Sequence, residues 1–244
     1  QRQSHLIEQN YIIDDIADSI TVPGTDSNIW LTMQQRVDRD YAAFGELSFD
    51  ITDQLTATGG IRVYNYKNSL VGFFGYAEGF SGDREDPMDT PGVIVRDGTG
   101  VAGCGVLDGP PRPPVVPGSP CTNLDKKTSD TDFIHKLNLT YTFNPDALVY
   151  ATWSRGFRPG GINPRGTLPP YDAATLDNYE LGWKTTFGDG FRFNGSIYQQ
   201  DWDGIQLSFL DPNGLTEIRN AGIARIRGIE LDLGYETGGF TISV

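Results

Sequence analysis

Strict alternation of apolar and polar residues, over stretches of about ten residues, is the feature that most constrains this fold. Successive side chains of a β-strand point to opposite faces, so each stretch has one apolar and one polar face. We expect the apolar set to face lipid: Leu47, Phe49, Leu139, Tyr141, Leu181 and Trp183. We expect the alternating charged set to face the lumen of a barrel: Glu46, Lys136, Glu180 and Lys184.

Composition agrees with strands that have a single apolar face. Hydrophobic residues make up 38% of the 244-residue chain, and no apolar run reaches the roughly 18 residues that a membrane helix needs. Any membrane span is therefore expected to be a strand. The formal charge of −13 argues against a nucleic-acid partner, because phosphate binding needs clustered Lys and Arg.

Short and long connections alternate along the chain, as in an outer-membrane barrel with tight periplasmic turns and long extracellular loops. Turn-forming residues occupy 52–54, 144–146, 188–190 and 237–239. The longer connections lie near 77–131, 158–174 and 211–214. A soluble β-sandwich also alternates, but it should not sort its loops by length in this way.

The pattern predicts an all-β fold: an antiparallel transmembrane β-barrel segment of about eight strands. Their expected ranges are 28–51, 55–76, 132–144, 147–157, 175–187, 191–210, 215–236 and a last strand from 240. Arg225 and Arg227 share the parity of Ile229, which indicates either a strand that projects beyond the lipid or a bulge; we favour projection. An open sheet edge is not viable in lipid, so the chain is expected to be a segment of a longer protein.

Three stretches, 148–163, 176–184 and 220–232, resemble in order and spacing the late barrel strands of TonB-dependent outer-membrane receptors. The resemblance implies a barrel of about 22 strands that is closed by an N-terminal plug. It also implies a bacterial outer-membrane location, with lipid or lipopolysaccharide and a small-molecule ligand as partners and no cofactor. Because this sequence has no plug and no TonB box, residues 1–244 are expected to be part of one barrel domain, coupled to the TonB complex through the missing plug.

Candidate ligand contacts lie where strands become long loops. Arg and aromatic side chains at such a mouth can hold an anionic or polar ligand. The candidates are Arg155, Phe157, Arg158 and Asn163, followed by Tyr76 and Phe80. The alternative is that these residues only fold the loop.

Cys104 and Cys121 have sixteen residues between them in one Gly/Pro-rich stretch, and we expect them to form a disulfide in an oxidising compartment. The alternative is two free thiols. The acidic stretch 83–89 could hold Ca²⁺, although its spacing fits no known loop pattern and solvated acid is favoured. Ile12, Ile16 and Ile20 permit a short helix, and an irregular loop is equally compatible with them.

The leading functional hypothesis is energised uptake of a scarce nutrient such as a metal–siderophore chelate, a vitamin or a glycan. A passive porin and a surface adhesin or phage receptor are the alternatives. An enzyme is not expected, because two histidines, His5 and His135, supply neither a metal site nor a Ser/His/Asp set. The G-x-G-x-x-G match at 98–103 lacks the following helix that a dinucleotide site needs.

Overall fold

The computed structural model describes residues 2–15, 21–22, 24–76, 112–164, 168–188, 190–210 and 216–243. Nine strands form one antiparallel sheet in the order β1-β2-β3-β4-β5-β6-β7-β10-β11, and β8 pairs with β9 in a separate hairpin. The strands are β1 (Arg2–Ile12), β2 (Asn28–Asp50), β3 (Leu55–Tyr76), β4 (Leu124–Asn144), β5 (Ala147–Arg158), β6 (Ala174–Phe187), β7 (Phe191–Asp203), β8 (Gln206–Leu210), β9 (Thr216–Asn220), β10 (Ile223–Thr237) and β11 (Phe240–Ser243).

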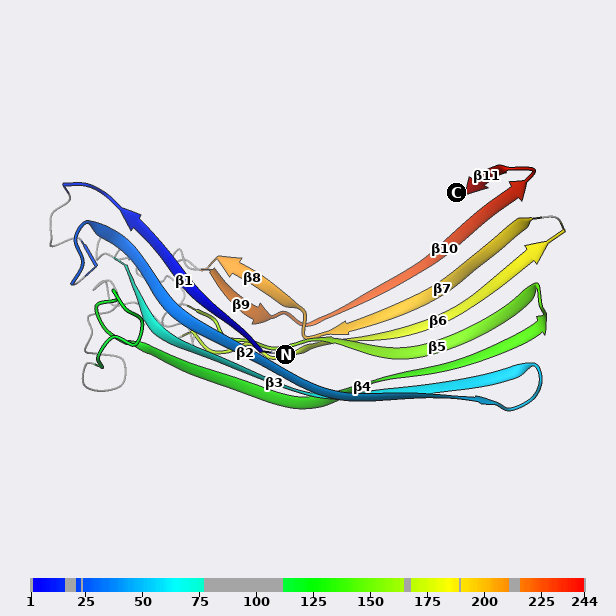
Figure 1. Ribbon diagram of the computed structural model, residues 1–244, viewed down its shortest axis with the longest axis horizontal. Helices are drawn as coiled ribbons and strands as arrows, with labels where there is room; N and C mark the ends of the chain where they lie inside the picture. The colour runs from blue at the N-terminus through cyan, green and yellow to red at the C-terminus, as the bar shows by residue number, and fades with distance from the viewer. Residues whose placement is uncertain are drawn as a thin grey trace.

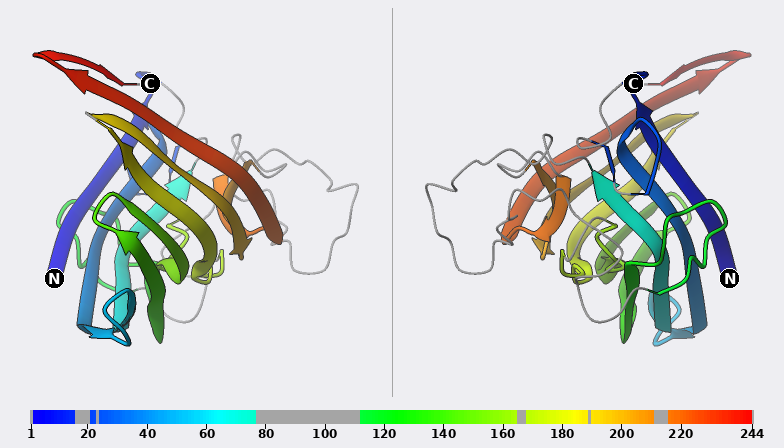
Figure 2. Two further views of the ribbon diagram at one scale, coloured as in Figure 1. Left: turned by 90° about the vertical axis from the view of Figure 1, so that its right-hand side faces the viewer. Right: turned by 90° about the vertical axis from the view of Figure 1, so that its left-hand side faces the viewer.

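The sheet is long and curved, and its two ends differ in their connections. Figure 1 shows the tight turns β2–β3, β4–β5, β6–β7 and β10–β11 together at one end and the longer connections at the other. Figure 2 shows, along the strands, that the sheet bends like part of a cylinder wall. The predicted sorting of loops by length is therefore confirmed for the described residues. None of the described residues form a helix that could cross a membrane.

Strand register confirms the two predicted sets of side chains. Leu139 lies opposite Ala57 and Ala151, and Ala151 lies opposite Leu181, so these apolar residues share one face. Lys136 lies opposite Gly60, and its ammonium approaches the Glu46 carboxylate at 3.5 Å on the other face. Outward apolar side chains are well exposed, as expected for a surface that meets lipid: Leu47 is 83% and Leu139 50% accessible.

The polar face is the interior of the curve. Ile162, from the connection after β5, packs in one buried cluster with Leu70 and Phe74 of β3 and Leu124 of β4. The two β3 residues have the parity of Gly60, so the β5–β6 connection folds onto the same face as Glu46 and Lys136. Polar side chains therefore line the inside of the curve, and the apolar face is left for lipid.

The strand count was underestimated, and two strand boundaries were wrong. Instead of about eight strands, the described residues form nine in the sheet and two in the hairpin. β1 (Arg2–Ile12) was not expected; it ends at Ile12, whereas Ile16 and Ile20 lie outside the described residues, so the short helix or irregular loop considered there stays untested. The expected strands 191–210 and 215–236 are each divided, at Gly204 (φ 65°) and Gly222 (φ 61°). β7 and β10 pair without a register shift, which excludes a bulge at Arg225 and Arg227.

Candidate functional site

Part of the chain folds back into the curve of the sheet at the long-connection end. We call residues 159–164 and 168–173 together with the β8–β9 hairpin the inner layer. Asn163, 1% exposed, joins its two parts. Its Nδ2 donates to the carbonyl oxygens of Pro169 (2.8 Å) and Ile218 (2.9 Å), and its Oδ1 accepts from the Ile218 backbone N–H (2.8 Å). The β5–β6 connection and the hairpin are thereby held as one unit.

A second amide side chain repeats this arrangement closer to the sheet. Gln206 at the start of β8 donates through Nε2 to the carbonyl oxygens of Pro159 (3.0 Å) and Asp172 (2.9 Å). Asn220 at the end of β9 accepts from the Asp172 N–H at 2.8 Å and donates to the Asp172 and Gly204 carbonyls. These amide side chains thus give hydrogen-bond partners to backbone groups that would otherwise be unpaired inside the curve of the sheet.

Two polar side chains of the wall attach the inner layer to the sheet. Gln34 of β2, fully buried, donates to the Pro164 carbonyl at 2.7 Å. Lys126 of β4 donates through Nζ to the carbonyl oxygens of Asn163 (2.9 Å) and Leu168 (3.0 Å). Burial lowers the pKa of the Lys126 ammonium to about 8, because the charged form loses its hydration there.

A cleft of about 380 Å³ separates the inner layer from β1–β3; we call it the mouth cleft. The wall and the inner layer both line it with charged, amide and aromatic groups. The lining residues are Gln3, Arg36, Asp38, Arg39, Asp40, Tyr66, Asn68, Phe157, Arg158, Pro159, Gly160, Tyr171 and Gln206. A polar ligand entering from the long-connection end would meet this mixed surface.

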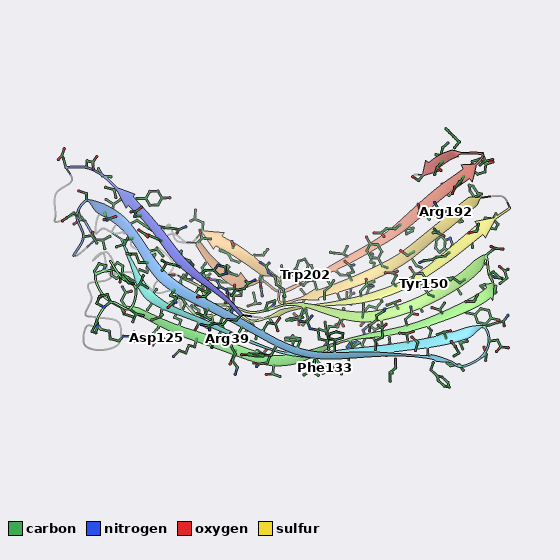
Figure 3. All side chains as sticks on the ribbon, in the orientation of Figure 1. Arg39, Asp125, Phe133, Tyr150, Arg192 and Trp202 are labelled. Carbon is green, nitrogen blue, oxygen red and sulfur yellow. The ribbon has the colours of Figure 1, made fainter. Side chains whose placement is uncertain are left out.

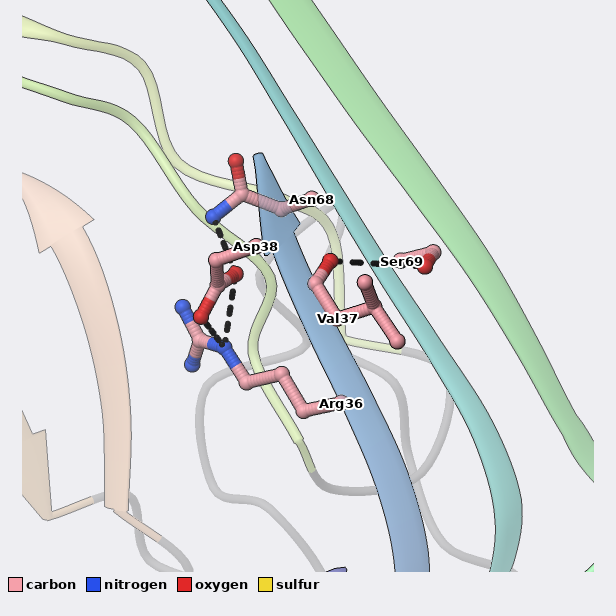
Figure 4. A network of polar contacts seen from close by, with 5 residues as sticks. All are labelled: Arg36, Val37, Asp38, Asn68 and Ser69. Atoms are coloured by element: carbon pink, nitrogen blue, oxygen red, sulfur yellow. Dashed lines mark hydrogen bonds and ion pairs between the residues drawn. The ribbon is translucent and has the colours of Figure 1, made fainter. Parts of the chain in front are cut away.

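The charged centre of the mouth cleft is a network around Asp38 (Figure 4). Its carboxylate accepts hydrogen bonds from Arg36 Nε at 2.9 and 3.1 Å and from Asn68 Nδ2 at 2.8 Å. Only Nε of the Arg36 guanidinium is used in these bonds. Its two terminal nitrogens make none of these bonds and could donate to a carboxylate, phenolate or phosphate oxygen of a ligand.

Aromatic rings and close backbone packing fix the shape of the mouth cleft. Phe157 stacks on Tyr64 with ring centroids 3.6 Å apart and an interplanar angle of 12°. A Cβ at Gly160 would lie 2.5 Å from the Tyr171 carbonyl oxygen and 2.6 Å from the Tyr66 hydroxyl. Only glycine fits there, so the first turn of the β5–β6 connection lies directly against the wall.

The predicted contact residues have different environments. Phe157 and Arg158 line the mouth cleft, whereas Asn163 is buried and fully engaged within the inner layer. Arg155 forms a two-pronged ion pair with Asp177 of β6, at 2.9 Å from Nε and 2.6 Å from Nη2. Tyr76 ends β3, and Phe80 lies outside the described residues.

Other predicted features lie partly beyond the described ranges. Cys121 is 3% exposed in a cluster with Val22 and Phe73, but Cys104 is outside the described residues, so their disulfide stays a prediction. The acidic stretch 83–89 is also outside them. Within the described ranges, no group of three or more His, Cys, Asp or Glu side chains is arranged to hold a metal ion.

A hollow of about 1090 Å³ lies on the apolar face rather than in the interior. Leu47, Leu139 and Leu181 are among its lining residues. A lipid-facing hollow with this lining suits acyl chains, and a polar solute arriving from outside the cell would not reach it. The mouth cleft is therefore the better candidate for a ligand site.

Sequence reasoning missed the wall of the mouth cleft. Arg36, Asp38 and Asn68 lie within strands, whereas the predicted contacts lie where strands become long loops. A signal was present: Arg36 and Asp38 continue the even-numbered polar row of Glu46 along the same strand. Where inward-facing polar residues continue along a strand beyond its outward apolar residues, that part of the strand belongs to the wall at the mouth of the barrel.

Comparison with known proteins agrees with this architecture. The family model "TonB dependent receptor-like, beta-barrel" matches residues 7–244. The pesticin receptor of Yersinia enterocolitica is 31% identical over 110 residues, which are 43% of this chain and 16% of that receptor.

Two solved structures share the fold of the chain. The ferric yersiniabactin uptake receptor FyuA of Yersinia pestis matches with a TM-score of 0.59 and 19% identity, over 87% of this chain and 26% of that one. The ferric-catecholate import receptor Fiu of E. coli K12, in its closed form, matches with a TM-score of 0.55 and 18% identity, over 97% of this chain and 32% of that one. This chain thus spans about a quarter to a third of either receptor. It belongs to the TonB-dependent receptor family and forms part of the β-barrel of such a receptor in the bacterial outer membrane.

Proposed function

We propose that the chain is part of a receptor for TonB-energised uptake of a scarce nutrient, and that the mouth cleft contacts this ligand. The observation that carries the proposal is that Arg36 and Arg39 of the wall and Arg158 beside the inner layer line one cleft together with aromatic neighbours. Such a surface suits an anionic, oxygen-rich and partly aromatic compound. A metal–siderophore chelate has this chemistry, and a carboxylated vitamin or glycan shares part of it.

Similar receptors support uptake over the alternatives. FyuA is described as a ferric yersiniabactin uptake receptor and Fiu as a ferric-catecholate import receptor. Coupling to TonB would require a plug domain, which a passive porin does not have. The likeness to a pesticin receptor favours a second role for the same outward surface, the capture of a protein or phage at the long loops.

The experiment is an uptake and binding assay with the full-length receptor in cells, using ⁵⁵Fe loaded on a catecholate, a hydroxamate or a phenolate chelator as probes. An Arg158→Ala variant should bind the accepted chelate about tenfold more weakly or worse, because a hydrogen bond to a charged group contributes about 1.5–3 kcal/mol. Barrel assembly and heat resistance should be unchanged.

Arg36→Gln should also weaken binding of the chelate. Arg192→Gln, near the tight turns and away from the mouth cleft, is the matched control and should bind the chelate as the wild type does. Equal binding by the wild-type receptor and both cleft variants would refute the assignment of the mouth cleft. Uptake that persists without TonB would instead refute energised transport.

A further inference from the structure

Phe44 of β2 is a large apolar side chain on the polar interior face of the wall. Its parity is that of Glu46, and its ring is 84% exposed, as much as Leu47 on the lipid face (83%). The next residues on the interior face toward the tight turn, Ser48 and Asp50, are polar. Phe44 therefore departs from the alternation that holds for the rest of this part of the strand.

Phe44 borders a hollow of about 410 Å³ in the interior face. We call it the wall hollow; its lining includes Phe44, Gly60, Arg62, Ile134 and Lys136. Register places Phe44 opposite Arg62 of β3, and Arg62 opposite Ile134 of β4. An aromatic ring, a guanidinium and an aliphatic side chain thus lie in one row across three strands. Gly60, which follows toward the tight turn, has no side chain to fill the space beside them.

Two cations of the wall hollow are loosely paired. The Lys136 ammonium lies 3.5 Å from the Glu46 carboxylate, and the Arg62 guanidinium lies 3.6 Å from the Asp40 carboxylate. The side chains of the two cations remain 51% and 41% exposed. Since both can also donate to a further carboxylate, the wall hollow suits a surface that offers an apolar socket with an Asp or Glu beside it.

The wall hollow lies within the height of the lipid and below the mouth cleft. Phe44 precedes Ile51, at the tight turn, by 7 residues, and it follows Asp38 of the mouth cleft by 6. At about 3.3 Å per residue and a tilt of about 40°, Phe44 is about 18 Å above the turn and about 15 Å below Asp38, within an apolar band of about 25 Å. A ligand held at Asp38 therefore lies above the wall hollow.

Strand register gives the same height. Ala43 lies opposite Val63, and Val63 lies opposite Phe133 of β4, so Phe133 marks the level beside Phe44. Figure 3 shows Phe133 nearer the tight turns than Arg39, which lines the mouth cleft. At this level the lumen of a barrel of about 22 strands is too wide for the side chains of its own wall to fill.

We propose that the wall hollow is a docking site for the plug domain of the receptor, and that Phe44 inserts into an apolar socket on the plug with a carboxylate beside it. The inference rests on the proposed function, since TonB-energised uptake requires a plug. Burial of the exposed ring supplies the attraction. Arg62 and Lys136 fix the orientation of the plug surface by charge-assisted hydrogen bonds to its carboxylate.

The test places the photo-reactive amino acid p-benzoylphenylalanine at position 44 of the full-length receptor in cells. Irradiation without added ligand should join position 44 to a plug peptide, which mass spectrometry of the digested receptor identifies. That peptide should contain apolar residues next to an Asp or Glu. The same probe in place of Phe49, on the lipid face, is the control and should give no plug peptide. A probe at position 44 that joins no plug peptide, or only one without such residues, would overturn the proposal.

A Phe44→Ala variant gives a second measurement. Its plug peptides should exchange backbone hydrogen about tenfold faster than those of the wild type, because one buried aromatic contact is lost. Ser48→Ala is the matched control: it removes a hydroxyl that bonds within the wall, to Thr58 Oγ1 at 2.9 Å, and should leave exchange of the plug unchanged. Equal exchange in Phe44→Ala and the wild type would contradict the anchoring role. Uptake that still depends on TonB in that case would leave the proposed function standing, so the two failures are distinguishable.

Discussion

Replacing Asn163 with alanine should release the inner layer without disturbing the barrel wall. The side chain is 1% exposed and makes three hydrogen bonds, two to carbonyl oxygens and one from the Ile218 N–H. Alanine removes both the amide and its oxygen. The three backbone groups then lose their partners within a buried region, where water reaches them only if the layer opens.

The size of the effect follows from these bonds. Each contributes about 1 kcal/mol net, so the closed arrangement should lose about 3 kcal/mol relative to the open one. Since about 1.4 kcal/mol is a factor of ten, the open population should rise about 100-fold. The wall is unaffected, because its strands are joined by continuous ladder hydrogen bonds from β1 to β7.

Hydrogen exchange read by mass spectrometry on the full-length receptor measures both regions at once. Peptides covering 168–173 and 216–220 should exchange about 100-fold faster in Asn163→Ala, and those of β3 and β4 should be unchanged. Asn138→Ala is the matched control, since that amide bonds only to side chains of the wall: it donates to Thr152 Oγ1 and accepts from Thr140 Oγ1, both at 2.8 Å. Unchanged exchange of the inner layer in Asn163→Ala would refute the role given to this side chain.

Three further perturbations test other parts of the structure. The folded-state pKa of Lys126, about 8, lies below its usual value of 10.5. The cost of burying the charged ammonium is therefore present below pH 8 and is relieved as the pH rises toward 10.5. Protease resistance of the inner layer should increase between pH 8 and pH 10.5 in the wild type and should stay constant in Lys126→Met. Leu139→Arg should cost about 2–4 kcal/mol in the free energy of unfolding in lipid, and Thr140→Arg on the interior face much less. Cys121→Ser should speed proteolysis of the β3–β4 connection without changing the heat resistance of the barrel, and equal proteolysis would contradict the predicted bond with Cys104.

The wall could be predicted from sequence because lipid imposes a strict period of two. Leu139 and Lys136 are assigned to opposite faces by parity alone, and tight turns such as 52–54 fix where each strand ends. β1 could not be found in this way, since Gln3 and His5 on one face and Ser4 and Glu8 on the other place polar groups on both faces. Outside the lipid, backbone pairing holds a strand without requiring an apolar face.

The inner layer could not be predicted, because it depends on contacts between segments that are distant in sequence. Asn163 and Ile218 are 55 residues apart, and nothing in either stretch indicates that one amide joins them. The division of β7 from β8 did leave a signal. Gly204 and Gly222 both have positive φ, and the Gly204 N–H donates to the Gly222 carbonyl at 3.0 Å, which turns the hairpin away from the sheet.

The way in which the inner layer is held bears on how a ligand could pass it. One apolar residue, Ile162, packs in the buried cluster with the wall, whereas Gln34, Asn163 and Gln206 hold backbone carbonyls through amide hydrogen bonds. Each such bond is weak in net terms, because water can replace it once the layer moves. An apolar interface of the same area would resist opening more strongly and would expose hydrophobic surface to the lumen. A layer held mainly by amide hydrogen bonds should therefore open at a smaller free-energy cost than one held by an apolar interface of the same area.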